Sequence, residues 1–219
     1  MSSSSSLPKT TTEWTEIPYS KLQHSYGHTS TLFKDYMITF GGRSESWRFD
    51  FHGITILNLK TNSSQKFKLK GENPKARCRH SACLFDSNKI LIFGGFSKEG
   101  LMCHPAIISI EETSRYNSSF QKIDTELALT YKGVRTTGEK DLARYGHSAD
   151  VFKNKMYIFG GRHQEKPKKI NNNELWTLNL GNLAVKIISL LFRKFPLGML
   201  CNEGGKAKYI IGWNFFVKN

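Results

Sequence analysis

The chain has 219 residues and a formal net charge of +14 at pH 7. A chain of this length can bury one sizeable core or two small ones, and no apolar stretch approaches the roughly 20 residues of a transmembrane helix. We therefore expect no membrane association, while the excess of basic residues is compatible with an acidic protein or a nucleic acid as partner.

The first residues, MSSSSSLPKTTT, predict a disordered polar tail over 1–12. They lack the basic start and the apolar centre of a secretory signal, so we expect a cytoplasmic protein, with the nucleus as the alternative. The four cysteines, Cys78, Cys83, Cys103 and Cys201, have irregular spacings. Without an export signal, this pattern favours reduced thiols over disulfides.

A pattern that occurs three times organises the rest of the chain. The copies are YGHTSTLFKDYMITFGG (26–42), CRHSACLFDSNKILIFGG (78–95) and YGHSADVFKNKMYIFGG (145–161). Each has a His, a Ser or Thr, an apolar run, a polar turn, a second apolar run and a glycine doublet. The first glycine follows the His by 13, 14 and 13 residues, and the extra residue of the second copy falls in its turn, where insertions cost least.

Each copy predicts a β-hairpin followed by two further strands. The second apolar runs, MITF, ILIF and MYIF, are typical of a central strand covered on both faces. The glycine doublet after them permits positive φ and a close approach of another backbone. We expect third strands within 53–59, 106–110 and 172–180, and fourth strands within 65–69, 120–123 and 184–187. Four antiparallel strands per repeat fit the blade of a β-propeller.

These residues resemble the kelch motif, in which an Arg and a His-Ser/Thr pair precede the glycine doublet and a Trp lies in the third strand. Arg77, Arg144 and Trp176 match that pattern, whereas the first copy has Ser25 in place of the Arg, and the first two copies lack the Trp. The resemblance implies an all-β, kelch-type β-propeller with four-stranded antiparallel blades. It covers about 13–187, with repeats at about 22–70, 76–124 and 143–187.

The repeated residues are expected to have structural roles. They are His28, Gly41, Gly42, His80, Gly94, Gly95, His147, Gly160, Gly161 and Trp176. Because the three histidines would lie on separate blades, we expect each to hydrogen-bond backbone within its own blade rather than to bind a metal.

The propeller is expected to be incomplete, since three blades cannot close a ring of about four to eight. The segment 12–18 looks like the outer strand of a preceding blade, and 188–219 is an atypical segment that we do not count as a fourth repeat. Three explanations remain open: a truncated longer protein for which 188–219 is an alternative ending, a ring closed by two or more chains, and degenerate blades that the pattern misses. Uncovered blade faces would favour self-association.

Residues for chemistry are scarce, and we expect no catalytic residue, no cofactor and no metal. Cys78, Cys83 and Cys103 with His104 do not have zinc-site spacing, and Cys78 and Cys83 are interpreted as small core residues. The sequence contains no phosphate-binding glycine loop and no nucleophile elbow.

The loops after the glycine doublets are the best candidates for binding, because in kelch propellers such loops help to form the partner-binding face. The candidate residues are Arg43, Trp47, Arg48, Arg162, His163 and Lys166. An Arg on a rigid rim can bind a carboxylate or a phosphate through two hydrogen bonds, and an exposed Trp can supply an apolar anchor. The sequence therefore predicts a non-catalytic protein-interaction module or scaffold for an acidic or phosphorylated segment.

Two other functions remain as alternatives. Some kelch-type propellers are oxidases, lyases or isomerases, although their sites draw on most blades of a closed ring. The run KFKLK, with Lys66, Lys68 and Lys70 on one side of a strand, could instead bind nucleic acid. We interpret these lysines as a solvated sheet edge that discourages aggregation.

Overall fold

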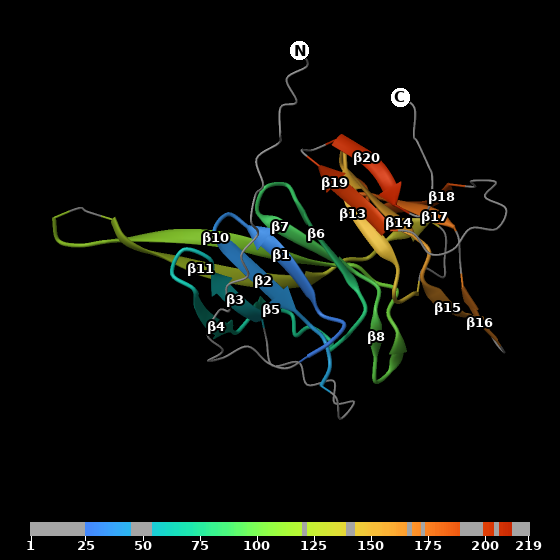
Figure 1. Cartoon of the computed structure of the whole chain (residues 1–219), viewed down its shortest axis with the longest axis horizontal. Coiled ribbons are helices and arrows are strands. Elements are labelled where there is room, and N and C mark those ends of the chain that lie inside the picture. The colour runs from blue at the N-terminus through green and yellow to red at the C-terminus, as the bar shows by residue number, and fades with distance from the viewer. Residues whose placement is uncertain are drawn as a thin grey trace, which may run out of the picture.

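The computed structural model describes residues 25–44, 54–119, 122–138, 143–165, 168–171, 174–188, 199–203 and 206–211. All regular elements in these ranges are β-strands (Figure 1). Within this part of the chain, no helix reaches the length and apolar character required to cross a bilayer.

Three successive sheets, here called blades 1, 2 and 3, correspond to the three sequence repeats. Blade 1 has the strand order β1-β2-β3-β4, blade 2 the order β5-β11-β10-β7-β6, and blade 3 the order β12-β18-β17-β14-β13. The bounds in blade 1 are β1 Thr29–Phe33, β2 Tyr36–Phe40, β3 Ile54–Asn58 and β4 Ser63–Phe67. Those in blade 2 are β5 Lys70–Gly71, β6 Ser81–Phe85, β7 Lys89–Phe93, β10 Ala106–Tyr116 and β11 Lys122–Gly133. Those in blade 3 are β12 Thr137–Gly138, β13 Ser148–Phe152, β14 Lys155–Phe159, β17 Leu175–Asn179 and β18 Ala184–Ile188.

The four main strands of each blade are antiparallel, as the repeat pattern predicts. Tight turns with positive φ connect the first two strands. Lys34 has a φ of 50°, Asp86 of 48° and Asn154 of 57°. Such values give the turn a twist that matches the right-handed twist of the strands.

Blades 2 and 3 also have a short fifth strand at the outer edge that was not predicted. β5 pairs in parallel with β11, and β12 pairs in parallel with β18. Each of these strands lies in the connection from the preceding blade, so the chain joins successive blades at their outer edges. The predicted outer strand at 12–18 lies outside the described residues.

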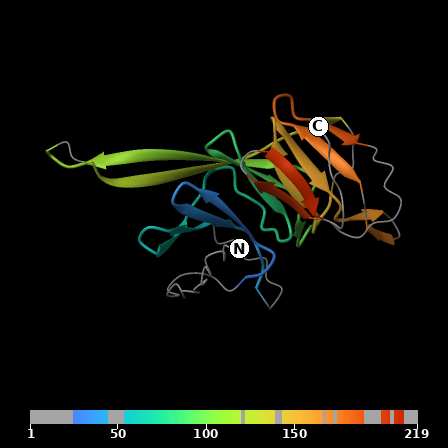
Figure 2. The same ribbon diagram turned by 45° about the horizontal axis from the view of Figure 1, so that its top comes forward.

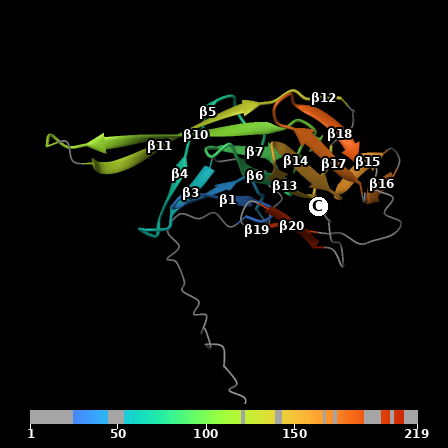
Figure 3. The same ribbon diagram turned by 90° about the horizontal axis from the view of Figure 1, so that it is seen from above.

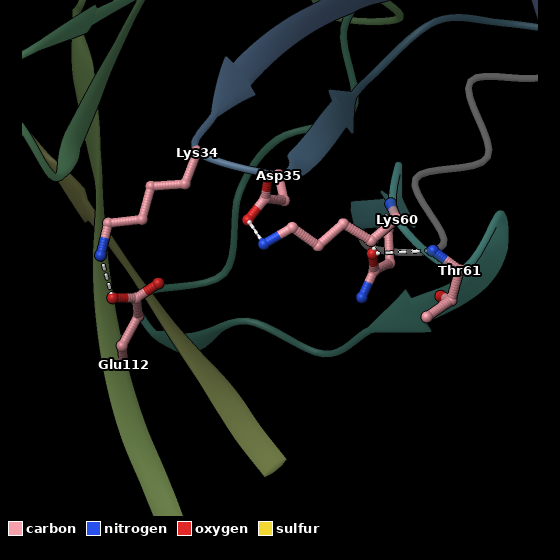
Figure 4. A network of polar contacts seen from close by, with 6 residues as sticks. Lys34, Asp35, Lys60, Thr61 and Glu112 are labelled. Atoms are coloured by element: carbon pink, nitrogen blue, oxygen red, sulfur yellow. Dashed lines mark hydrogen bonds and ion pairs between the residues drawn. The ribbon is translucent and has the colours of Figure 1, made fainter. Parts of the chain in front are cut away.

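The β10–β11 hairpin is longer than the sequence suggests. We expected a fourth strand at 120–123, but the part of β11 that lies opposite the blade portion of β10 is Thr130–Gly133, and the hairpin extends beyond it to Tyr116. In Figures 1 and 2 this hairpin projects away from the blades. Lys34, in the first turn of blade 1, forms an ion pair with Glu112 on β10 of blade 2. The adjacent Asp35 forms an ion pair with Lys60 of its own blade, with 2.7 Å between the Lys60 nitrogen and the carboxylate oxygen (Figure 4).

The blades pack face to face through two apolar cores. The first lies between blades 1 and 2 and contains Phe33, Ile38, Phe40, Ile54, Ile56, Ile90, Ile92, Ala106, Ile108, Ile110, Leu127, Leu129 and Tyr131. The second lies between blades 2 and 3 and contains Cys83, Leu91, Phe93, Met156, Ile158, Trp176 and Leu178. Alternate side chains of β7 enter different cores, because successive residues of a strand point to opposite faces.

The innermost strands β1, β6 and β13 lie next to one another in that order (Figure 3). A further hairpin, β19 Met199–Glu203 and β20 Lys206–Ile211, places β19 beside β13. This position continues the series of inner strands, in a segment that the sequence analysis does not count as a repeat. The described blades do not form a closed ring.

Candidate functional site

The glycine doublets lie where one blade meets the next. The amide of Gly42 donates to the carbonyl oxygen of Arg77 in blade 2 at 2.8 Å, and the amide of Gly95 donates to that of Arg144 in blade 3 at 2.8 Å. The end of the second strand in one blade is therefore fixed to the start of the next repeat.

Close contact explains why the first residue of each of these doublets is glycine. Gly41 and Gly94 have φ values of 69° and 65°, which side chains disfavour. A Cβ at Gly41 would lie 2.6 Å from both the Arg77 carbonyl oxygen and His80 Cε1, and one at Gly94 would lie 2.6 Å from the Arg144 carbonyl oxygen. In the third doublet, the amide of Gly160 donates to Glu174 at 3.2 Å, and Gly161 lies against His147 of its own blade.

We expected each repeat histidine to form a hydrogen bond within its own blade. Instead, His80 and His147 each contact the preceding blade. His80 Nε2 lies 2.8 Å from Thr29 Oγ1 of blade 1, and His147 Nε2 lies 2.9 Å from Ser81 Oγ of blade 2. The expected type of contact occurs only at His28, whose Nδ1 lies 3.1 Å from the Ser25 carbonyl oxygen. The hydroxyl of the repeated Ser/Thr is thus the partner of the next repeat's imidazole.

Burial keeps the two connecting imidazoles neutral. The loss of solvation lowers the pKa of His80 to about 3, helped by the nearby charge of Arg77, and lowers the pKa of His147 to about 3, helped by Arg144. These side chains hold the interface together and are poor proton donors or acceptors near pH 7.

The repeat arginines are buried beside the same doublets. Arg77 donates to the Gly94 carbonyl oxygen at 3.4 Å and to the Tyr131 hydroxyl at 3.1 Å, and burial lowers its guanidinium pKa. Arg144 donates to the Gly160 carbonyl oxygen at 3.1 Å, and its guanidinium lies 5.2 Å from the centre of the Trp176 ring. Trp176 itself is buried and donates to Glu174 at 2.9 Å.

The residues that follow the doublets are held by backbone pairs and do not start free loops. Arg43 pairs with Tyr26, Phe96 with Cys78, and Arg162 with Tyr145, each through two hydrogen bonds of 2.9–3.1 Å. Phe96 and Arg162 begin short hairpins, β8–β9 in blade 2 and β15–β16 in blade 3 (Figure 1). Their bounds are β8 Phe96–Ser97, β9 Gly100–Leu101, β15 Arg162–Glu165 and β16 Lys168–Asn171.

The predicted binding residues that the structure describes differ in their exposure to solvent. Arg43 is only 6% exposed and stacks over Tyr26 at 4.6 Å, so little of it faces solvent. Arg162 is exposed and His163 half-buried on the same rim. The remaining predicted residues, Trp47, Arg48 and Lys166, lie outside the described residues.

Sequence reasoning missed Arg79, an exposed cation at the centre of this rim. Its amide donates to Gly27 of blade 1 at 2.7 Å, and its carbonyl oxygen accepts from Gly146 of blade 3 at 2.9 Å. Its φ is 54°, and its guanidinium lies 5.9 Å from the centre of the Tyr145 ring. The aligned repeats contained the signal, since the other two copies have glycine at this position.

Two of the described cysteines lie in the apolar interior. Cys78 and Cys83 are buried, and burial raises the pKa of Cys83 to about 12. Cys83 contributes its thiol to a 3.3 Å contact with the Ala149 carbonyl oxygen of blade 3. Among the residues that the structure describes, no three His, Cys, Asp or Glu side chains are grouped to hold a metal.

The basic run at 66–70 forms an outer edge. Lys66, Lys68 and Lys70 are exposed, while Phe67 and Leu69 are half-buried and pack against the first core. The alternation therefore places the cations in solvent and the apolar side chains inward.

Successive four-stranded sheets, joined through a glycine doublet and a His-hydroxyl contact, define the blades of a β-propeller. The model of the KLHDC2/KLHL20/DRC7 kelch-repeats domain matches residues 6–106 and 27–194. The chain therefore belongs to the kelch-repeat family.

Several proteins share this similarity. Kelch domain-containing protein 3 of Rattus norvegicus is 29% identical over 161 residues, which are 73% of this chain and 37% of that protein. Host cell factor 2 of Homo sapiens is 27% identical over 71% of this chain and 18% of its own length. The leucine-zipper-like transcriptional regulator 1 homolog of Drosophila melanogaster is 28% identical over 154 residues, which are 70% of this chain and 14% of that protein. The chain thus matches little more than a third of the first of these relatives.

Proposed function

We propose that this chain is a non-catalytic protein-interaction module, and that it binds an acidic segment of another protein on the face where the glycine doublets end. Kelch-repeat domains typically bind proteins. The observation that carries the proposal for this face is the position of Arg79, a fixed and exposed cation between two blades.

Backbone strain at Arg79 supports a functional role. A non-glycine residue with positive φ costs on the order of 1–3 kcal/mol and persists where the surroundings enforce it, often at binding sites. Hydrogen bonds to Gly27 and Gly146 enforce it here. Glycine, which occupies the same position in both neighbouring repeats, would satisfy these bonds without the strain.

The surroundings of Arg79 suit an anionic group with an apolar neighbour. Tyr145 lies under the guanidinium, and the Phe96 ring is 6.0 Å from the Tyr145 ring. A guanidinium above an aromatic ring keeps its edge donors available for a carboxylate or a phosphate. The exposed Arg162 adds positive charge on the same rim.

The test is a peptide array with acidic, phosphorylated, neutral and basic sequences, followed by anisotropy titrations of the selected peptides. We expect acidic or phosphorylated peptides to be selected, with an affinity that falls as salt increases. Arg79→Gly should weaken that binding about tenfold, the scale of one lost charged hydrogen bond, and should leave folding intact because the neighbouring repeats already have glycine.

Lys153→Gly is the matched control. Lys153 also has a positive φ, of 44°, and also lies over an aromatic ring, that of Phe152 at 5.3 Å, but it is in the turn between β13 and β14 at the opposite end of the blade. It should not change peptide binding. Selection of neutral or basic peptides, or equal effects of the two variants, would refute the proposed face.

A further inference from the structure

The β19–β20 hairpin has the same arrangement as the inner hairpins of the three blades. Each blade begins with an inner strand and a second strand that pair antiparallel, and β19 and β20 pair in the same way. β19 lies beside β13 as β13 lies beside β6 and β6 beside β1 (Figure 1). The hairpin therefore stands where the first two strands of a fourth blade would stand.

The register of this hairpin also follows the repeat. In all four hairpins the first residue of the inner strand pairs with the last residue of the second strand, and a glycine follows directly. The second strand and its glycine read MYIFG at 156–160 in blade 3 and KYIIG at 208–212 here. The likeness is thus one of sequence as well as of position.

Blade 3 is buried on the face that points away from blade 2. Trp176 and Leu178 of β17 enter the second core, and the residues that alternate with them, Leu175 and Thr177, belong to the opposite face. These two are only 7% and 9% exposed. A further segment of the chain therefore covers this face, and β19–β20 is the described hairpin that lies beside the inner strand of blade 3.

The polar contact that joins the described blades has no counterpart here. In those blades a hydroxyl at the start of one inner strand meets the imidazole directly before the next inner strand, as Ser81 Oγ meets His147 Nε2 at 2.9 Å. The next hydroxyl in the series belongs to Ser148, and its Oγ is buried without a hydrogen-bond partner among the described residues. The residue directly before β19 is Gly198 instead of a histidine.

We propose that β19–β20 is the inner hairpin of a divergent fourth repeat, and that it caps blade 3 through an interface that lacks the hydroxyl–imidazole contact. A buried hydroxyl without a partner is costly, so this interface is weaker than the two between the blades. The hairpin is then a cap that opens before the blades separate. Of the explanations that the sequence leaves open, this one favours a degenerate blade, and it is independent of the proposed peptide-binding face.

The repeat also assigns the residues that meet blade 3. Ala149 and Ile158 pair across the inner hairpin of blade 3, and both pack in the core shared with the preceding blade. Leu200 and Ile210 are the equivalent pair in β19 and β20. By this equivalence Ile210 belongs to the interface with blade 3, and its neighbour Ile211 belongs to the other face of the hairpin.

The experiment is native-state hydrogen exchange on the full chain, read by mass spectrometry. Ile210→Asp should place a charge in the interface and speed exchange in β13 and β14 about tenfold, while β7 in blade 2 keeps its exchange rate and shows that the other blades stay folded. Ile211→Asp is the matched control and should have a much smaller effect. Unchanged exchange in β13 after Ile210→Asp, or equal effects of the two variants, would overturn the inference.

The missing imidazole provides a second test. Gly198→His should slow exchange in β13 and β19 about fivefold, the scale of one hydrogen bond, and the gain should vanish when Ser148→Ala is added. Ser148→Ala alone should leave stability unchanged, whereas Ser81→Ala should lower it because His147 loses its partner. Equal losses from the two alanine variants, or no gain from Gly198→His, would contradict the assignment.

Discussion

Blade 2 and the two end blades have the same repeat pattern, but they are buried to different extents. In β7 of blade 2, residues Ile90, Leu91, Ile92 and Phe93 are at most 2% exposed. In β14 of blade 3, Met156 and Ile158 are buried, whereas Tyr157 and Phe159 are half-buried. The difference follows from the neighbours, since blade 2 packs between two blades and blade 3 packs on one described blade. The repeat sequence specifies a blade, and the adjacent blades complete the burial of its strands.

The largest expected effect compares two phenylalanines at equivalent positions. Phe93 is fully buried in the second core, so Phe93→Ala should lower the free energy of unfolding by about 3–5 kcal/mol. Phe159 is half-buried, and Phe159→Ala should cost less than half as much. Urea unfolding at a concentration where the chain is a single 25.0 kDa species measures both. Equal losses would mean that blade 3 is covered as completely as blade 2.

Glycine at the blade junction is the next test. Gly94→Ala should cost about 3 kcal/mol, because positive φ and the clash with the Arg144 carbonyl oxygen add together. Gly146 has a similar φ of 63°, but a Cβ there would meet nothing within 4 Å. Gly146→Ala should therefore cost only about 1 kcal/mol, from the backbone strain alone. Equal thermal shifts for the two variants would contradict the close approach at Gly94.

Acid should weaken the junctions through His80 and His147. Their pKa values are about 3 in the folded chain and about 6.5 when unfolded. The unfolded state therefore binds more protons between these values, and stability is lost as pH falls from about 6.5 towards 3. Each histidine contributes a slope of up to about 1.4 kcal/mol per pH unit. Replacing His80 by Gln should reduce the slope in urea titrations at several pH values, and an unchanged slope would contradict this role of His80.

The smallest effect is expected at the outer edge. Replacing Lys66, Lys68 and Lys70 by Gln should change stability by no more than about 0.5 kcal/mol for each substitution, since all three are exposed. Binding to single-stranded and double-stranded nucleic acids should not change. A loss of salt-sensitive binding in the triple variant would support the nucleic-acid alternative instead.

The sequence could predict the blade but not the interface. The apolar runs and the doublets Gly41-Gly42, Gly94-Gly95 and Gly160-Gly161 specify local hairpins, and the structure has strands there. The contact between Ser81 and His147 joins residues 66 positions apart, so no local pattern reveals it. The within-blade role expected for His80 and His147 was wrong for this reason.

The same limit applies to the long hairpin and to the candidate site. The polar residues that extend β10 and β11 pair with each other, and their composition resembles that of a loop. The burial of Arg43 depends on Tyr26, which lies before the hairpin in sequence and under the guanidinium in space. Arg79 was identifiable only as a departure from glycine in the aligned repeats, and its strained backbone becomes evident in the structure.

Native-state hydrogen exchange on the single chain, followed by mass spectrometry, tests most directly whether the neighbouring blades determine stability. The account predicts the slowest exchange in β7 and in Ala106–Ser109 of β10, because blade 2 is covered on both faces. It predicts faster exchange in β2 and β14, which are covered less completely. Uniform protection across β2, β7 and β14 would contradict the account.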